Sequence, residues 1–416
     1  MTALHDPLTL PSGRVLPNRI MKPALSEGLG DKQNAPDGRL EQLYRTWSRG
    51  GYGLAITGNV MIDRTQLGEP GNIVIEDERH LSALSRWAKA TQDAGVPIWA
   101  QLNHPGRQAN PLDIGHTPVA PSPIPLGLPG ASTPRELTHS EIEDIIERFA
   151  TAAAVCETAG FDGVQVHGAH GYLVAQFLSP LSNQRTDAWG GDPERRRRFV
   201  LEVVRRIRTR VTPGFSVGIK LNSADFQRGG FTEGESRDVV AALAKEEIDL
   251  IEISGGSYEQ PAMMGTAAAG TRAREAYFLE YARTVRSLVG DVPLAVTGGF
   301  RSRAGMATAI ADGECDVVGI GRPSATTPDA ADAILSGRAE TVVSHQVRAG
   351  LRRVLAKVTD LKTLDGILEL SWHTDQLHRL GSGLEPDLAR GRLATAIAMI
   401  RRNGRMSFRP KRGGSS

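Results

Sequence analysis

The sequence predicts an α/β protein with the (β/α)8 fold, the TIM barrel, and two observations support this. Short apolar segments rich in β-branched residues recur along the chain, and longer amphipathic segments separate them. Strict alternation of strand and helix is typical of a parallel sheet with right-handed crossovers. Eight such units over roughly 320 residues fit a closed barrel, which usually spans ~250 residues with insertions allowed, better than an open doubly wound sheet.

Each expected strand or helix is a segment in which apolar residues recur with a regular spacing. The strands are Arg19–Met21, Gly53–Thr57, Pro97–Gln101, Phe161–Val166, Phe215–Lys220, Asp249–Ile253, Pro293–Thr297 and Asp316–Ile320. The helices are Leu40–Arg49, Arg79–Asp93, Ser140–Thr158, Arg196–Arg210, Glu235–Glu246, Arg274–Leu288, Arg303–Asp312 and Asp329–Leu335. In such a barrel the active site lies where the strands end, so we expect the functional residues there.

Two segments depart from the alternation. The proline-rich stretch His104–Arg135 follows the third strand, so it leaves from the rim that carries active sites; a substrate lid and simple surface packing are both open for it. After the barrel domain, residues 1–336, we expect a helical extension over residues 337–416. Its helices are expected over Val347–Val358 and Leu388–Arg401, and its tail, Arg409–Ser416, is expected to be disordered.

Composition excludes several classes of protein. The formal net charge is only +2, so nothing indicates nucleic acid or an anionic membrane surface as a partner. The two cysteines, Cys156 and Cys315, lie far apart, which excludes a disulfide framework, a zinc ribbon and a cysteine-ligated iron–sulfur cluster. The start of the chain, Met1–Arg14, is not a secretory signal, and no apolar run approaches the ~18 residues that span a bilayer. We therefore expect a soluble cytoplasmic protein.

The most informative stretch is His167–Tyr172, which places His167, His170 and Tyr172 directly after the fourth strand. One helical turn at the exit of this strand would point both imidazoles the same way. Two neutral imidazoles that donate N–H groups to one carbonyl oxygen would polarise it, and the phenol could supply a proton nearby. This pattern favours addition of hydride and proton across an activated double bond. A buried, hydrogen-bonded histidine pair is the alternative.

Polar residues and glycines follow several other strands. Gln101 offers a flat pattern of hydrogen-bonding groups, and Lys220 delivers a cation to the barrel mouth. Glycines after the last two strands, Gly298, Gly299 and Gly321, let backbone N–H groups approach a phosphate, and Arg322 adds charge. Together these features describe a planar heteroaromatic cofactor with a phosphate tail. Flavin mononucleotide (FMN) fits that description, with Lys220 near the anion that forms on reduction.

The chain also resembles the Old Yellow Enzyme family of FMN-dependent NAD(P)H:flavin oxidoreductases. The most specific passage runs from His167 to Gly191 and continues to Arg198-Phe199. Supporting matches, in family order, are Asn18-Arg19-Ile20, Gln101-Leu-Asn-His-Pro-Gly-Arg107, Pro121-Ser-Pro123, Gly298-Gly299 and Gly321-Arg322. They cover roughly residues 1 to 335, so coincidence is a poor explanation.

The resemblance implies roles for individual residues. His167 and His170 would bind the oxygen of an α,β-unsaturated carbonyl or nitro compound, and Tyr172 would protonate the carbon α to it. NADH or NADPH would reload the flavin in the same pocket, in ping-pong turnover, and no metal is implied. The residues that would hold FMN are Pro23, Ala24, Leu25, Ser26, Gly58, Asn59, Gln101, Lys220, Gly298, Gly299, Gly321 and Arg322.

Four positions depart from the family pattern. Ser26 stands where relatives usually have Thr or Cys, and Lys220 stands where arginine is common, which keeps the charge but loses the fork geometry. Glu27 and Gly28 replace larger or cationic residues, so we expect a more acidic pocket of different shape. Relatives that reduce dienoyl-thioesters carry an iron–sulfur cluster, which two cysteines cannot bind.

Other functions remain open at this stage. A flavin-dependent dehydrogenase or oxidase of another small substrate on the same barrel is the main alternative. A lyase or isomerase could use Lys220 as a Schiff base, a hydrolase could use His167 and His170 as metal ligands, and a barrel that binds flavin could act as a sensor. The expected partner is a small electrophilic alkene, and a homo-oligomer is possible.

Overall fold

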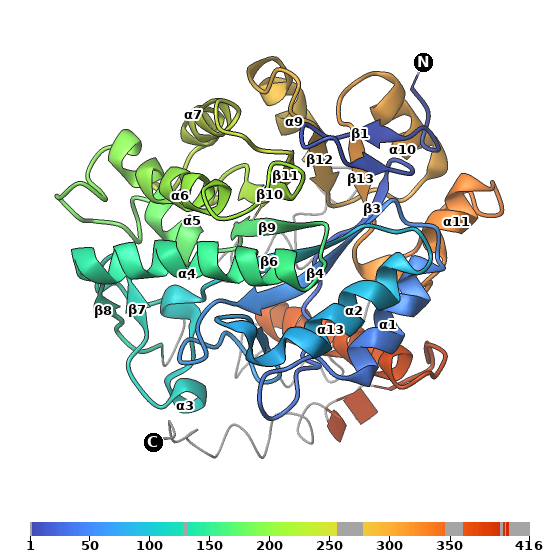
Figure 1. The fold of residues 1–416 in the computed structure, drawn as a ribbon, viewed down its shortest axis with the longest axis horizontal. Coiled ribbons are helices and arrows are strands. Elements are labelled where there is room, and N and C mark those ends of the chain that lie inside the picture. The colour runs from blue at the N-terminus through green and yellow to red at the C-terminus, as the bar shows by residue number, and fades with distance from the viewer. Residues whose placement is uncertain are drawn as a thin grey trace.

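The computed structural model describes residues 2–127, 131–255, 278–345, 361–391, 394–395 and 397–398. Its centre is a closed barrel of parallel strands inside a ring of helices (Figure 1). The strands, in chain order, are β3 (Ile20–Lys22), β4 (Leu54–Met61), β6 (Ile98–Asn103), β9 (Gly163–Gly168), β10 (Ser216–Asn222), β11 (Leu250–Ser254), β12 (Leu294–Thr297) and β13 (Val317–Gly319). Pairing of β13 with β3, and of β3 with β4, closes the barrel. The predicted (β/α)8 fold and its eight strands are confirmed.

The strands form where they do because both of their faces are buried. Every residue of β6, β9, β10 and β11 is buried, which suits near-continuous apolar segments. Outward-facing side chains meet the helices in one large core that includes Trp87, Phe149 and Phe199. The polar side chains in these strands therefore stand out as exceptions, and several of them belong to the candidate site.

The surrounding helices agree with the predicted ones to within a few residues at most ends. They are α1 (Gly38–Ser48), α2 (Leu81–Gln92), α4 (His139–Thr158), α6 (Pro193–Arg208), α7 (Glu233–Leu243), α9 (Leu279–Val285), α10 (Arg303–Ala311) and α11 (Ala330–Leu335). Capping boxes start α4, at Thr138 and Glu141, and α7, at Thr232 and Glu235. The first four residues of the predicted helix Arg274–Leu288 lie outside the described residues.

A hairpin near the start of the chain covers the amino-terminal end of the barrel. Its strands, β1 (Leu8–Thr9) and β2 (Val15–Leu16), are antiparallel. Leu10 and Leu16 pack in one cluster with Leu54 and Trp99, which belong to barrel strands. Because this end is filled, the carboxyl-terminal mouth is the end left for a ligand.

Short elements complete the described part of the fold. They are β5 (Ile73–Val74), η1 (Glu78–His80), η2 (Gly106–Gln108), α3 (Pro111–Ile114), β7 (Val119–Ala120), β8 (Arg135–Glu136), α5 (Leu173–Leu178), η4 (Arg286–Leu288) and η5 (Arg322–Ala325). Strands β7 and β8 pair with each other within the long stretch after the third barrel strand. That stretch is therefore partly ordered into a small sheet of its own.

The extension contributes one long helix, α13 (Leu361–Gly381), which the sequence pattern did not predict. Helix α13 packs against α1 and η5, and Figure 1 shows it in orange-red beside α1. The predicted segment Val347–Val358 lies outside the described residues, and only part of Leu388–Arg401 lies within them. Within the described ranges, no helix has both the length and the apolar character needed to cross a membrane.

Candidate active site

The turn after β9 brings His167, His170 and Tyr172 together. The ring of His167 lies 5.1 Å from the ring of His170 and 4.7 Å from that of Tyr172, measured between ring centres. The expected helical turn is wrong: the chain reverses through left-handed residues, His170 at φ 61° and Gly171 at φ 76°. A non-glycine residue with positive φ is uncommon and is found where surrounding contacts hold it.

Those contacts come from two neighbouring elements. The backbone N–H of His170 donates to Oδ1 of Asn222, at the end of β10, over 3.2 Å. Its carbonyl accepts a hydrogen bond of 2.8 Å from the side-chain amide of Gln108. Gln108 lies in the long proline-rich stretch, whose described residues brace this turn and do not line the cavity described below. A lid and surface packing both stay predictions for this stretch.

Both imidazoles are neutral at ordinary pH. Burial, together with His170 and Lys220, holds the pKa of His167 well below its usual range. Burial and the nearby charge of Lys220 lower the pKa of His170 to about 3. Nε2 of His170 lies 2.9 Å from the hydroxyl oxygen of Ser254. A neutral imidazole carries one N–H group. His167 can donate from Nε2, since its Nδ1 accepts the backbone N–H of Ala169, and His170 can donate from Nδ1 in the tautomer whose Nε2 accepts from Ser254.

A polar layer crosses the barrel beneath the histidines. In the sheet register, Lys220 of β10 stands beside His167 of β9 and beside Glu252 of β11. Nζ of Lys220 lies 3.0 Å from Oε1 of Glu252, and both side chains are buried. The side-chain amide of Gln101 donates to Oε1 of Gln165 over 2.8 Å. The cation and the amide predicted to face a flavin ring therefore both stand at the barrel mouth.

The segment after β3 forms a rigid floor beside this layer. The hydroxyl of Ser26 donates to Oδ1 of Asn59 over 3.0 Å. The expectation that Glu27 makes the pocket more acidic is wrong, because its carboxylate points into the protein. There it accepts the backbone N–H of Gly58 at 2.9 and 3.1 Å and the hydroxyl of Tyr44, and Nζ of Lys22 lies 3.5 Å away. Gly58 therefore serves to anchor this segment.

One cavity collects most of the predicted residues. Those that line it are Ala24, Leu25, Ser26, Asn59, Gln101, His167, His170, Tyr172, Lys220 and Arg322. Pro23, Gly58, Gly298, Gly299 and Gly321 are not among its lining residues in the described part of the chain. Gly298 and Gly299 follow β12 with φ of 133° and 88°, a conformation that turns backbone N–H groups in a way other residues rarely allow.

These residues fit FMN on the chemistry of the donors present. The hydroxyl of Thr297, directly before Gly298, is buried and has no hydrogen-bond partner among the described residues. An unpaired buried hydroxyl, a glycine pair and the guanidinium of Arg322 together suit a phosphate group. Gln101 and Lys220 suit the polar edge of a flavin ring.

Five residues near the cavity were missed. Glu69, Glu369 and Leu370 line it, and Gln165 and Glu252 lie in the layer beneath. A signal existed for the last two, since each is a polar residue with an apolar residue on either side of it in its strand. No local signal identifies Glu369 and Leu370, because α13 reaches the mouth only through the tertiary fold.

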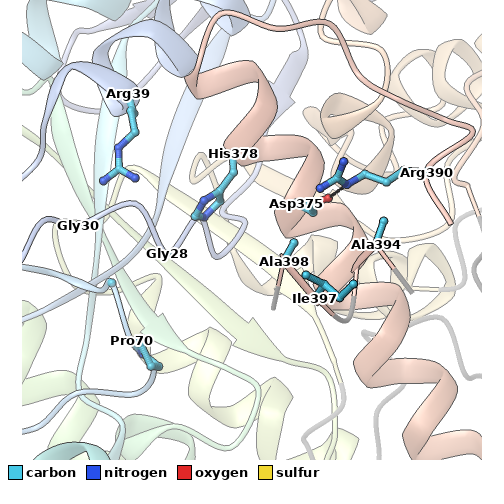
Figure 2. A pocket seen from close by; sticks show the side chains of 11 residues that line it. Gly28, Gly30, Arg39, Pro70, Asp375, His378, Arg390, Ala394, Ile397 and Ala398 are labelled. Carbon is cyan, nitrogen blue, oxygen red and sulfur yellow. Dashed lines mark hydrogen bonds and ion pairs between the residues drawn. The ribbon is translucent and has the colours of Figure 1, made fainter. Parts of the chain in front are cut away.

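A separate groove of about 710 Å³ lies between α13 and the loops that contain Gly28, Gly30 and Pro70 (Figure 2). Its charged side chains have partners: Arg390 pairs with Asp375, and Arg39 pairs with Asp37. None of the predicted site residues lines this groove. Within the described residues, no cluster of three or more His, Cys, Asp or Glu side chains could hold a metal ion.

The fold, and the chemistry of the side chains that line the cavity at its carboxyl-terminal mouth, are those expected of a (β/α)8-barrel oxidoreductase. The chain matches the NADH:flavin oxidoreductase / NADH oxidase family over residues 3–341 and belongs to that family, whose cofactor is FMN. The predicted resemblance is thereby confirmed.

Individual relatives agree with this assignment. The NADH-dependent flavin oxidoreductase iliE of Hypocrea jecorina (strain QM6a) is 38% identical over 355 residues, which cover 79% of this chain and 88% of that protein. Morphinone reductase in complex with tetrahydroNAD is 28% identical, with a TM-score of 0.68 over 82% of this chain and 92% of that one. An Old Yellow Enzyme homologue from Zymomonas mobilis, 24% identical, shares the fold with a TM-score of 0.69 over 82% and 94% of the two chains.

Proposed function

We propose that this protein reduces the carbon–carbon double bond of α,β-unsaturated carbonyl or nitro compounds, with NADH as the reductant. The observation that carries the proposal is the grouping of His167, His170 and Tyr172 in one cavity with Gln101 and Lys220. The name of the relative iliE specifies NADH, and the name of morphinone reductase specifies a reduction; both support the proposal.

The histidines hold the substrate. Each neutral ring donates one N–H to the carbonyl or nitro oxygen, which draws electron density from the double bond and leaves its β carbon open to hydride. Since His167 is only 4% exposed, its hydrogen bond forms away from competing water. Imidazolium rings would bind the same oxygen, but the lowered pKa values of both histidines keep the rings neutral near pH 7.

Tyr172 supplies the proton. Its ring lies 4.7 Å from that of His167, so a substrate held by the histidines lies within reach of its hydroxyl. The hydroxyl donates a proton to the α carbon and is then reprotonated from solvent. Tyr172 is 8% exposed, which leaves a path for that exchange.

The remaining candidates would hold FMN. Lys220 and Gln101 would bind the polar edge of the ring, and the segment Pro23–Ser26 with Asn59 would support the ring. Gly298, Gly299, Gly321 and Arg322 would bind the phosphate. When bound, FMN supplies two-electron hydride chemistry, accepting hydride from a nicotinamide and delivering it to an acceptor.

An anaerobic stopped-flow experiment tests the proposal. Enzyme reduced with one equivalent of NADH is mixed with 2-cyclohexen-1-one, and return of the yellow absorbance is followed. We expect rapid reoxidation, and we expect His170→Ala to slow it by about 100-fold with FMN still bound. Reoxidation by oxygen but not by the enone would contradict the proposal and would favour a flavin-dependent oxidase.

A further inference from the structure

Glu252 lies at the centre of the polar layer beneath the cavity. It is a single carboxylate within β11 and is completely buried, at 0% exposure. Its partner in the sheet register is Lys220 of β10, and the ion pair between them spans 3.0 Å. Burying a carboxylate costs free energy unless the carboxylate is paired and hydrogen-bonded. A completely buried carboxylate next to the cavity therefore indicates that its charge has a function there.

The second carboxylate oxygen of Glu252 forms a hydrogen bond to a residue on a different strand. Oε2 accepts a hydrogen bond of 2.7 Å from the side-chain amide of Gln165, on β9. The carbonyl oxygen of the same amide accepts from Gln101, on β6, over 2.8 Å. Glu252 therefore also decides which way the amide of Gln165 faces, since only its NH2 end can donate to a carboxylate.

The amide of Gln101 is fixed in turn. With the carbonyl end of Gln165 directed at it, Gln101 must present its NH2 group inward, which leaves its carbonyl oxygen for another partner. One carboxylate thus sets the orientation of an amide three strands away and the position of an ammonium on the neighbouring strand. These are the two side chains expected at the polar edge of the flavin.

We propose that Glu252 is a positioning residue that orients Lys220 and Gln101 and sets the reduction potential of the bound FMN. The proposal rests on the placement of FMN given above. Because the carboxylate offsets the charge of Lys220, the flavin ring faces a neutral pair instead of a bare cation. The negative charge that the cofactor gains on reduction is stabilised less, and the reduced cofactor remains a stronger hydride donor.

The test is the two-electron midpoint potential of the holoenzyme, measured by dye-coupled titration without any substrate. Glu252→Gln retains an acceptor for Gln165 but leaves Lys220 without a counter-charge. We expect the ratio of the affinities for reduced and oxidised FMN to increase about tenfold, which raises the potential by about 30 mV for a two-electron couple. An unchanged or lowered potential in this variant would overturn the proposal.

Asp249 provides a matched control. It lies directly before β11 at the opposite end of the barrel, is also 0% exposed, and pairs with Arg208. Asp249→Asn removes a buried carboxylate next to the same strand, at the end away from the mouth. We expect a loss of stability without a change in potential, and an equal rise in both variants would overturn the proposal.

A double variant keeps the proposal testable if Glu252→Gln folds poorly. Lys220→Met together with Glu252→Gln removes both buried charges, a change that proteins often tolerate. We expect Lys220→Met alone to lower the potential, and the double variant to have nearly the same potential as Lys220→Met. A difference of about 30 mV between these two variants would show that Glu252 does not act through Lys220.

The same series separates two kinds of failure. If Lys220→Met leaves both FMN affinity and potential unchanged, the placement of FMN is wrong, and the role of Glu252 falls with it. If Lys220→Met shifts the potential but Glu252→Gln does not, the placement stands and only the role of Glu252 is overturned. Neither outcome depends on which acceptor the enzyme reduces.

Discussion

The carboxylate of Glu369, on helix α13, forms an ion pair with the guanidinium of Arg322, which lies 47 residues earlier at the end of the barrel. Both residues line the cavity that contains the histidines. The helix is held in place from its other end as well, because Nε2 of His378 donates to the carbonyl of Glu27 over 2.8 Å. Helix α13 therefore forms part of the candidate site and contacts the barrel both at Arg322 and at the segment that contains Glu27.

The Glu369–Arg322 pair predicts an effect on cofactor affinity. If Arg322 binds the FMN phosphate, Glu369 competes for the same guanidinium and repels the phosphate. We expect Glu369→Gln to lower the dissociation constant of FMN by about 3- to 10-fold, as expected for loss of one partly exposed charge. Quenching of FMN fluorescence by apoprotein measures it. Asp375→Asn, on the same helix but paired with Arg390, is the control, and weaker FMN binding by Glu369→Gln would contradict the prediction.

Removal of the Tyr172 hydroxyl separates the two halves of turnover. We expect Tyr172→Phe to slow reoxidation of the reduced enzyme by an enone by about 100-fold or more, because the α carbon loses its proton donor. Reduction by NADH needs no such proton and remains close to the wild-type rate. Stopped-flow measurement of each half gives the two rates. Tyr52→Phe, a buried tyrosine outside the cavity, is the control; equal slowing of both halves would contradict the assignment.

The lowered pKa of His170, about 3, predicts that acid destabilises the fold. An unfolded histidine titrates near ~6.5, so between about pH 6.5 and 3 the unfolded chain binds a proton that the folded chain does not. Stability therefore falls as the pH falls through this window. We expect His170→Asn, which tolerates a positive φ, to lose about 2 kcal/mol less than the wild type between pH 7 and pH 5 in urea unfolding. Equal losses would show that the pKa of His170 is not lowered in the folded protein.

The buried pair below the floor predicts a strong effect on stability. Lys22 is completely buried, and burial lowers its pKa to about 8 although Glu27 opposes the shift. Glu27→Gln leaves this ammonium without a counter-charge, and we expect a loss of about 3–5 kcal/mol. The double variant Lys22→Met with Glu27→Gln is expected to recover much of it. Chemical unfolding at pH 7 measures both, and a loss of less than about 1 kcal/mol in the single variant would contradict the role of the pair.

The parts of the site that follow barrel strands could be predicted from the sequence, because the fold brings strand ends to one mouth. His167, Gln101 and Lys220 were found in this way, and they line one cavity. The orientation of Glu27 could not be predicted, since it lies in an irregular segment without a period. Glu252 could have been found, because a charged residue in an apolar strand of a closed barrel must point to the interior or be paired.

The contribution of α13 needed the tertiary structure. Its position over the mouth depends on packing against α1 and on the hydrogen bond from His378, and neither contact is encoded by a local pattern. The left-handed turn at His170 was missed for a similar reason: the contacts that hold it come from Asn222 and Gln108, which are distant in sequence.

The most direct test of the central claim follows the hydrogen atoms. NADH carrying deuterium at the transferred position of C4 is used to reduce excess 2-cyclohexen-1-one without oxygen, and the product is analysed by NMR and mass spectrometry. We expect saturated ketone with deuterium at the β carbon and, in ²H2O with unlabelled NADH, deuterium at the α carbon. Consumption of NADH without saturated product, or deuterium from NADH at the α carbon, would contradict the account.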